Sequence, residues 1–135
     1  MTHRTTAMLE SHPGTIDLDT EALAECLAAC FDCAQTCTAC ADACLAEDMV
    51  ADLVTCIRKN LDCADVCAAT GNVLSRQTGN NVETTRAALE ACRTACRACA
   101  EECEQHAQMH EHCRVCAETC RRCETACAEL LASLS

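Results

Sequence analysis

The sequence predicts an all-α protein, an up-down-up-down four-helix bundle with a short N-terminal helix. Cysteines recur at alternating steps of three and four residues, which places them along one stripe of a helix. The positions between them hold mostly Ala, Leu, Glu, Arg and Gln, which favour helices. The 135 residues include one phenylalanine, no tryptophan or tyrosine, one proline and three glycines. This composition excludes a β-sandwich, an aromatic platform for nucleic-acid bases and a loop-rich disulfide scaffold.

The N-terminal residues are expected to stand apart from the bundle. A short helix is predicted over residues 4–11, which stops at Pro13-Gly14. We therefore expect residues 1–18 to form an N-terminal segment. Residues 19–135 are expected to form the four-helix bundle, a single domain with a cysteine-lined core.

The 18 cysteines fall into four groups, and each group predicts one helix of roughly 25 residues whose cysteines face inward. The steps between neighbours are 4-3-4-3-4 in the first group, 4-3-4 in the third and 3-4-3-4 in the fourth. The second group steps by seven and then by four, because Asn60 occupies a position where the pattern would have a cysteine. The groups are Cys26, Cys30, Cys33, Cys37, Cys40 and Cys44; Cys56, Cys63 and Cys67; Cys92, Cys96, Cys99 and Cys103; and Cys113, Cys116, Cys120, Cys123 and Cys127.

Capping residues predict most of the helix boundaries. Asp19 or Thr20 can cap the first long helix, and Asp48 can cap the second. The short junction before Asp48 makes these two helices antiparallel neighbours. Gly79 suits a left-handed C-cap, and Asn81 suits the N-cap of the third helix.

The boundary between the third and fourth helices is predicted from length and register. A continuous helix over residues 82–133 would be roughly 80 Å long, too long for a compact domain of this size. The cysteine register also slips near residue 110. We therefore predict a turn over residues 107–111.

Charge and the absence of targeting signals narrow the functional classes. The formal net charge of −11 disfavours nucleic acid and anionic membranes as partners. Residues 1–18 contain no apolar signal region, and the chain nowhere holds 18 consecutive apolar residues. We expect a soluble cytoplasmic protein. Because the cytoplasm is reducing, so many cysteines indicate metal or redox chemistry rather than disulfides.

The cysteine stripes are expected to bind a soft metal ion. Core packing alone does not explain them, because Leu or Ala would fill the space without the risk of oxidation. Disulfides within one helix would be strained, because β-carbons three or four residues apart are roughly 5–6 Å apart, whereas a disulfide needs about 3.8 Å. Soft thiolates select Cu(I), Zn(II) or iron–sulfur clusters, and no C-x2-C-x2-C run typical of iron–sulfur sites occurs.

Geometry and charge favour Cu(I) over zinc. Straight helices are expected to offer pairs of sulfurs, which suit the low coordination number of Cu(I), whereas zinc takes four ligands. Burial keeps thiols protonated, and replacing each proton with one monovalent ion leaves the core charge unchanged. Zinc with four thiolates would leave each buried site at −2, which is costly. If each thiolate bridges two ions and each ion takes two thiolates, the capacity is about 18 Cu(I) ions.

This pattern, as in CLAACFDCAQTCTACADAC, resembles the bacterial copper storage proteins, specifically their cytosolic branch without an export signal. The resemblance covers residues 20–130. It implies a homotetramer of four-helix bundles, a core filled with Cu(I), and passage of copper through one end of each bundle lined with His or Met. It also implies that the copper is kept for copper enzymes or held where it does no harm. Copper chaperones or small thiols are the partners expected for loading and release.

The resemblance adds four candidate ligands, which are His106, His110, Met109 and His112. Asn60 is a fifth candidate, because it replaces a cysteine in the stripe of the second helix. His106 and His110 continue the stripe of the third helix, and Met109 lies four residues before the fourth cysteine group. Imidazole, thioether and amide oxygen can all bind metal. Each residue also has a plainer interpretation. The histidines can be exposed in a polar connection, Met109 can pack on the core, and Asn60 can fix helix register by hydrogen bonding.

Apolar residues continue the cysteine stripes beyond their ends and are expected to plug the bundle. They are Leu23, Met49, Leu53, Leu130 and Leu134. Antiparallel pairing of the first two helices would place Met49 with His106, His110 and Met109 at one mouth of the bundle, opposite Leu23.

Storage of many Cu(I) ions is the predicted function, in copper homeostasis, detoxification or supply to copper enzymes. The sequence shows no Ser–His–acid arrangement, Gly-rich phosphate loop or paired internal carboxylates, so we expect no enzymatic activity. Two alternatives remain open. One is a zinc or mixed-metal thiolate buffer of metallothionein type, and the other is a thiol redox reservoir, which would need a low-pKa cysteine near a cation.

Overall fold

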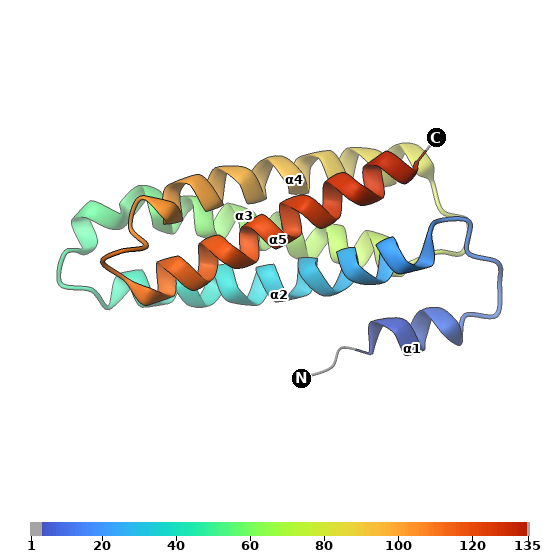
Figure 1. Ribbon diagram of the computed structural model, residues 1–135, viewed down its shortest axis with the longest axis horizontal. Helices are drawn as coiled ribbons and strands as arrows, with labels where there is room; N and C mark the ends of the chain where they lie inside the picture. The colour runs from blue at the N-terminus through green and yellow to red at the C-terminus, as the bar shows by residue number, and fades with distance from the viewer. Residues whose placement is uncertain (1–3, 135) are drawn as a thin grey trace.

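This computed structural model describes residues 4–134 of the chain. These residues contain five α-helices and one short 3₁₀ helix. The long helices α2, α3, α4 and α5 lie side by side in an elongated bundle, and α1 is short (Figure 1). The all-α class and the four-helix bundle with a short N-terminal helix are confirmed. The bounds are α1 Thr5–Glu10, α2 Thr20–Leu45, η1 Val50–Leu53, α3 Val54–Ser75, α4 Val82–Glu104 and α5 Glu111–Ser133.

The four long helices form a ring in chain order. α2 packs against α3 and α5, and α4 packs against the same two helices. Over residues 4–134 neither diagonal pair, α2 with α4 or α3 with α5, comes into comparable contact. The connections are short, so the helix direction alternates along the chain (Figure 1). All four long helices therefore face one common core.

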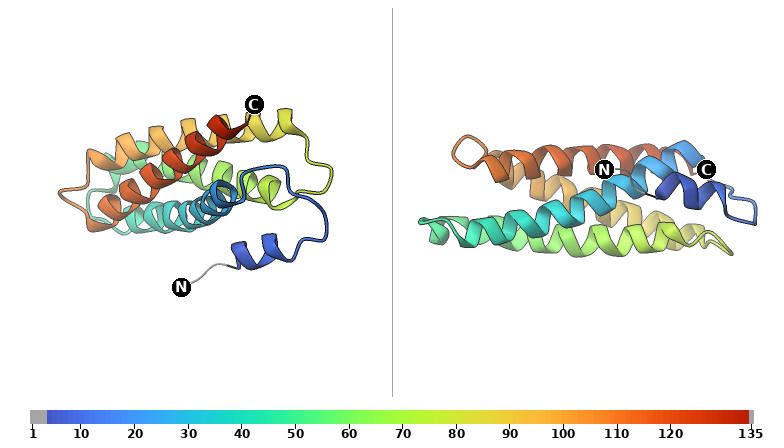
Figure 2. Two further views of the ribbon diagram at one scale, coloured as in Figure 1. Left: turned by 45° about the vertical axis from the view of Figure 1, so that its right-hand side comes forward. Right: turned by 90° about the horizontal axis from the view of Figure 1, so that it is seen from below.

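The connections divide between the two ends of the bundle. The α2–α3 and α4–α5 connections lie at one end, which we call the histidine end because it carries His106, His110 and His112. The α3–α4 connection and the segment that leads into α2 lie at the other end (Figure 2). We call that second end the leucine end, because Leu23 and Leu74 are fully buried there.

The N-terminal helix α1 lies along the outside of α2 and takes no part in the ring (Figures 1 and 2). The chain between α1 and α2 then crosses the leucine end, where Ile16 and Leu18 pack against the core. His12 Nε2 lies 3.1 Å from Thr78 Oγ1 in the α3–α4 connection. The N-terminal segment is thus held to the bundle both at the leucine end and through α1, whose Leu9 packs against the core.

Two predicted caps are confirmed. The Asp19 side chain accepts hydrogen bonds from the backbone N–H groups of Glu21 and Ala22, at 3.0 and 3.2 Å. Asn81 Oδ1 accepts from the backbone N–H of Thr84 at 3.0 Å. Gly79 has the expected positive φ of 67°, but it lies in the α3–α4 connection, whereas the C-cap of α3 is Arg76 in an extended conformation.

The prediction that Asp48 caps the second long helix is wrong. The helix begins only at Val54, after the 3₁₀ turn η1, and Leu53 is its N-cap without a side-chain cap bond. The backbone N–H of Asp52 donates to Met49 O at 2.8 Å within this turn. Backbone groups at a helix end can form hydrogen bonds within a 3₁₀ turn, so that they need no capping side chain. The 3₁₀ turn here also brings Leu53 into the core.

The turn that we predicted over residues 107–111 begins about two residues earlier in the structure. α4 ends at Glu104, and turns occupy residues 105–109 before His110 caps α5. The backbone N–H of His106 donates to Cys103 O at 3.0 Å, an i to i−3 bond that tightens the last turn of α4. His106 therefore sits in this turn rather than on a continued helix.

Candidate metal centre

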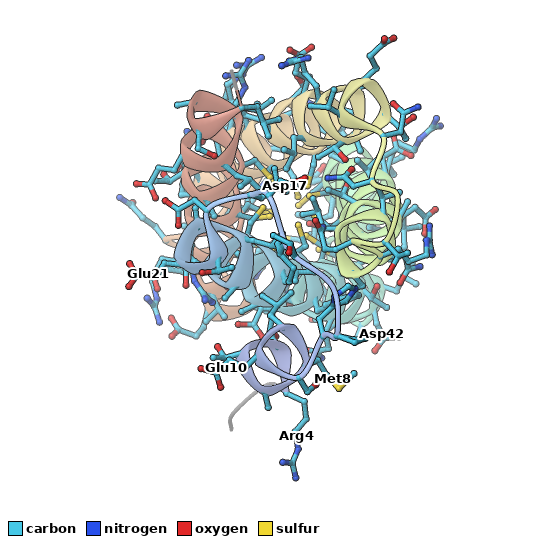
Figure 3. All side chains as sticks on the ribbon, turned by 90° about the vertical axis from the view of Figure 1, so that its right-hand side faces the viewer. Arg4, Met8, Glu10, Asp17, Glu21 and Asp42 are labelled. Atoms are coloured by element: carbon cyan, nitrogen blue, oxygen red, sulfur yellow. The ribbon has the colours of Figure 1, made fainter. Side chains whose placement is uncertain are left out.

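The core of the bundle is made of cysteine. All 18 cysteines are buried and free, none more than 2% exposed. Viewed along the bundle from the leucine end, the sulfur atoms gather between the four long helices, whereas the labelled acids Glu10, Glu21 and Asp42 lie outside (Figure 3). The helical spacing predicted this inward orientation correctly. Leu or Ala side chains would normally occupy such a core.

The sulfur atoms form a nearly continuous series along the bundle axis. Within this series, hydrogen-bonded neighbouring Sγ atoms lie 3.5–4.0 Å apart. The Cys26–Cys127 pair, at 3.8 Å, marks the leucine end of the series, and the Cys56–Cys103 pair, also at 3.8 Å, lies toward the histidine end. These separations far exceed the roughly 2.05 Å of a disulfide bond, so adjacent thiols are available as ligands.

Several sets of four sulfurs come together from three helices each. In each set the Sγ atoms lie within 4.8 Å of one another. The sets include Cys30, Cys92, Cys123 and Cys127; Cys33, Cys63, Cys67 and Cys96; Cys33, Cys37, Cys63 and Cys120; and Cys37, Cys99, Cys116 and Cys120. Pairs on one helix occur as expected, such as Cys33 with Cys37 at 3.7 Å. Facing helices add further ligands that the spacing on one helix does not reveal.

Asn60 faces three thiols at the position where the stripe of α3 lacks a cysteine. Its Oδ1 accepts hydrogen bonds from the thiols of Cys99, Cys116 and Cys103, at 2.9, 3.3 and 3.5 Å. Its Nδ2 donates to Cys56 Sγ at 3.7 Å. The side chain is fully buried. An amide oxygen is thus built into the sulfur series, where it can serve as a hydrogen-bond acceptor or as a ligand.

His112 contacts the sulfur series at the histidine end. Its Nδ1 lies 3.3 Å from Cys40 Sγ and 3.7 Å from Cys113 Sγ, and together with Cys44 these residues form a four-ligand set within 4.8 Å. Its Nε2 lies 2.9 Å from Glu47 Oε2. Burial lowers the pKa of His112, but hydrogen bonds and charge interactions with Cys40 and Glu47 outweigh burial and raise it overall.

His110 and His106 are also brought to this end. His110 is 7% exposed, its ring stacks on that of His112 with centroids 5.5 Å apart, and its Nδ1 lies 3.1 Å from Glu47 Oε2. His106 Nε2 lies 3.1 Å from Glu102 Oε2. Neither ring is freely exposed, contrary to the plainer interpretation of histidines in a polar connection. The sequence did not single out Glu47 or Glu102.

The two methionines placed at this mouth are largely outside it. Met109 is 61% exposed and Met49 is 41% exposed. Leu53, next in the stripe after Met49, is fully buried. Among the histidines and methionines predicted for this mouth, His112 is therefore the one with hydrogen-bond contacts to the thiols in the described residues.

The leucine end is closed by apolar side chains. Leu23 and Leu130 are fully buried, as the sequence predicted for an apolar plug, and Leu134 packs against the core. Leu74 and Leu89 are fully buried as well and complete the plug from α3 and α4. The two ends therefore differ in chemistry, apolar at one and rich in imidazole and carboxylate at the other.

Burial affects the thiols near the histidine end. Burial raises the pKa of the Cys44 thiol to about 11. Burial also raises the pKa of Cys113. Such thiols are neutral at pH 7 and must lose a proton before they bind a metal ion as thiolates.

Comparisons with known proteins agree with this geometry. A model of the copper storage protein family, Csp, matches residues 19–132. The copper storage protein Ccsp from Streptomyces lividans, in a structure loaded with 10 copper equivalents, is 59% identical with a TM-score of 0.95, over 96% of this chain and 99% of that chain. A structure of copper loading to a cytosolic copper storage protein from Streptomyces lividans (five coppers) is 64% identical with a TM-score of 0.84, over 85% of this chain and 96% of that chain.

None of the curated proteins matches the chain. Within residues 4–134, no helix is both long and apolar enough to cross a membrane.

Proposed function

Because this chain belongs to the copper storage protein family, it stores copper, and we propose that it holds Cu(I) on the thiolates of its 18 core cysteines. The observation that carries this proposal is the buried series of sulfur atoms, spaced 3.5–4.0 Å apart, that runs along the bundle axis. Soft thiolates are the preferred ligands of Cu(I). A catalyst or a sensor needs few ions, whereas this core offers ligands along its whole length, so the role is storage rather than catalysis.

Charge balance supports a monovalent ion. Each buried thiol gives up one proton when its sulfur becomes a ligand, and one Cu(I) replaces that proton without a change in net charge. The basic side chains with ion pairs, such as Arg121 and Arg122, lie on the outer surface and pair with surface acids. The charges of these two arginines are therefore balanced by surface acids rather than by core thiolates. With one ion per cysteine, the capacity is about 18 ions.

Copper is proposed to enter and leave at the histidine end. His106, His110 and His112 line it, whereas buried leucines close the other end. Neutral imidazoles bind an arriving cation without first losing a proton. Asn60 is proposed as an additional ligand through Oδ1, which faces three thiols. Met109 and Met49, exposed beside this end, are proposed to contact copper only outside the core.

The setting proposed for this function is the cytoplasm. The related Streptomyces lividans protein is described as cytosolic. Copper chaperones or small thiols would deliver and remove the ions, since thiol ligands exchange Cu(I) readily between soft donors. We also propose a homotetramer, as the resemblance to the family implies. Size-exclusion chromatography with light scattering tests this assembly, and a monomeric mass would reject it.

Zinc is the second candidate cargo, and the four-sulfur sets favour it. Four sulfurs within 4.8 Å of one another can surround a tetrahedral ion. However, the sets share members, since Cys33, Cys37 and Cys120 each belong to more than one, so they cannot all be filled independently. Each zinc would also bury a site charge of −2.

Anaerobic titration of the reduced protein with Cu(I), against a competing chelator of known affinity, tests the proposed cargo. We expect binding to continue to about 18 ions per chain. A plateau at one or two Cu(I) ions would reject storage in the core. A parallel titration with Zn(II) should saturate at far fewer ions, and zinc that displaces bound Cu(I) would favour the second candidate.

A further inference from the structure

The three histidines at the histidine end each face a carboxylate through one ring nitrogen. Glu47 Oε2 lies 3.1 Å from His110 Nδ1 and 2.9 Å from His112 Nε2. Glu102 Oε2 lies 3.1 Å from His106 Nε2. One carboxylate thus serves two stacked rings, and the other serves the third ring.

The second carboxylate oxygen of Glu102 forms an ion pair with a lysine of a neighbouring helix. Glu102 Oε1 lies 3.7 Å from Lys59 Nζ on α3, while its Oε2 faces the ring of His106, four residues further along the chain. Glu47 comes from the α2–α3 connection and reaches across to the residues that begin α5. Both carboxylates therefore link the histidines to a different part of the bundle, so that ring orientation follows from tertiary structure.

These contacts determine which ring nitrogen carries the proton. An ionised carboxylate only accepts hydrogen bonds, so the ring nitrogen that faces it is the donor. In a neutral imidazole the other nitrogen then keeps its lone pair. The hydrogen bonds of His112 Nε2 to Glu47 and of His106 Nε2 to Glu102 assign the proton to these nitrogens. For His110, the 3.1 Å ion-pair distance between Nδ1 and Glu47 Oε2 favours Nδ1 as the protonated nitrogen.

The opposite ring nitrogens are those that a metal ion needs. His106 Nδ1 and His110 Nε2 are buried and have no hydrogen-bond partner among the described residues. A buried polar atom without a partner is energetically unfavourable, which is a reason to expect a use for it. His112 Nδ1 points to the thiols of Cys40 and Cys113, at 3.3 and 3.7 Å.

We propose that Glu47 and Glu102 are positioning residues for copper uptake, which hold the three imidazoles so that each presents a deprotonated nitrogen to an arriving Cu(I). The inference rests on the proposed function, in which copper passes through the histidine end. A carboxylate that accepts the second N–H of a metal-binding histidine fixes the ring and raises its basicity. Loss of such a partner typically lowers metal affinity or activity by about 10- to 100-fold.

His110 is the most diagnostic of the three histidines. Its assigned proton lies on Nδ1, which is the less populated tautomer of free histidine, so only a specific partner would maintain it. In the Glu47→Ala variant this partner is lost, and the proton is expected to move to Nε2. His106, which Glu102 holds, should keep its tautomer in the same variant.

The first test measures tautomers without any copper. Nitrogen-15 NMR of the reduced, metal-free protein at pH 7.5 distinguishes protonated from deprotonated ring nitrogens. We expect His110 as the Nδ1–H form and His106 as the Nε2–H form. His110 should change to the Nε2–H form in Glu47→Ala and stay unchanged in Glu102→Ala, whereas His106 should keep its tautomer in both variants. Finding His110 as the Nε2–H form in the unaltered protein would overturn the proposal.

The second test measures the rate of Cu(I) uptake by stopped flow from a Cu(I)–chelator complex. Glu47→Ala and Glu102→Ala should each take up Cu(I) about tenfold or more slowly, with the final capacity unchanged. Asp48→Ala is the matched control, because it removes one exposed negative charge from the same connection without facing a ring. Circular dichroism establishes that each variant is folded.

The outcomes separate this proposal from the function on which it rests. Glu47→Ala uptake no slower than that of Asp48→Ala would overturn the positioning role, even where the total capacity for Cu(I) remains high. Failure of the unaltered protein to bind many Cu(I) ions would instead reject the storage function. The tautomer measurement would stand in that case, since it involves no metal.

Discussion

One substitution can distinguish a structural role of Asn60 from a metal-binding role. Its Oδ1 accepts from three thiols, which are weak donors, so loss of these bonds should change stability little. Asn60→Leu, which keeps the branched shape and the number of side-chain heavy atoms, is expected to change the free energy of unfolding of the metal-free protein by about 1 kcal/mol or less. If Oδ1 is a ligand, the Cu(I) capacity should fall by about one ion.

Chemical denaturation and anaerobic titration of the Asn60→Leu protein measure these two effects separately. Asn72→Leu, on the same helix but outside the stripe, is the control for a change from amide to apolar side chain. Unchanged Cu(I) capacity together with a large loss of stability would assign Asn60 to the fold alone.

The buried thiols make the metal-free protein sensitive to high pH. The pKa of Cys44 is raised from 9.0 to about 11 in the folded protein. A raised pKa means that the folded state holds the proton more tightly than the unfolded state, so this stability is fully present below pH 9 and is lost as the pH rises through 11. Between pH 8 and pH 10.5, the melting temperature of the reduced, metal-free protein should fall by on the order of 5 °C or more.

Calorimetry under anaerobic conditions with a non-thiol reductant measures this fall. The copper-loaded protein has no thiol protons to lose at its ligands, so its melting temperature should be nearly constant over the same range. A metal-free protein that is equally stable at both pH values would contradict the assignment of neutral buried thiols.

Helices α2 and α3 approach closely where the single aromatic residue meets a glycine. A β-carbon at Gly71 would lie 2.7 Å from the Phe31 ring, closer than any normal contact. Gly71→Ala therefore combines a gain in helix propensity of about 1 kcal/mol with displacement of the ring. In a Phe31→Ala background the clash is absent, so the same substitution should be more favourable by about 1 kcal/mol or more.

A double-mutant cycle by urea denaturation of the metal-free protein measures this coupling. Gly71→Ala should also leave the Cu(I) capacity unchanged, because both residues lie outside the sulfur series. A coupling energy near zero would show that the ring moves aside freely.

The helices and the orientation of the cysteines follow from sequence because both depend on local periodicity. Alternating steps of three and four residues define one face of a helix whatever surrounds it. Asp19 and Asn81 were predictable for the same reason, since a capping side chain bonds to backbone only two or three residues away.

Features that depend on contacts between helices were not predictable in the same way. The sets of four sulfurs combine three helices, and their composition depends on how far each helix is shifted along the bundle axis. Glu47 meets His110 and His112 across more than 60 residues of chain, and nothing near Glu47 in the sequence indicates this pairing. Asp48 was wrongly predicted as the N-cap of the second long helix. The 3₁₀ turn η1, with Leu53 buried in the core, lies between Asp48 and the start of that helix.

A core of neutral cysteines should keep the bundle folded without metal. Free cysteine behaves as a small apolar side chain when buried, and the leucine end adds a conventional apolar plug. Removal of copper by a strong chelator should therefore leave the far-UV circular dichroism spectrum of helices essentially unchanged, whereas copper should raise the melting temperature because it binds only the folded state. Loss of helix on copper removal would favour a metallothionein-type buffer.

The chemistry of the cysteine core also determines how the net charge of the protein changes when Cu(I) binds. Each Cu(I) replaces one thiol proton, so loading should release about one proton per ion and leave the formal net charge at −11. Each Zn(II) on four thiols would instead release about four protons and add a net charge of about −2. Proton release measured with a pH indicator during anaerobic titration, together with mobility in native electrophoresis, distinguishes the two ions. Cu(I) loading that increased the mobility of the folded protein would show that thiolate charge accumulates in the core. That result would contradict the charge balance on which a capacity of about one ion per cysteine depends.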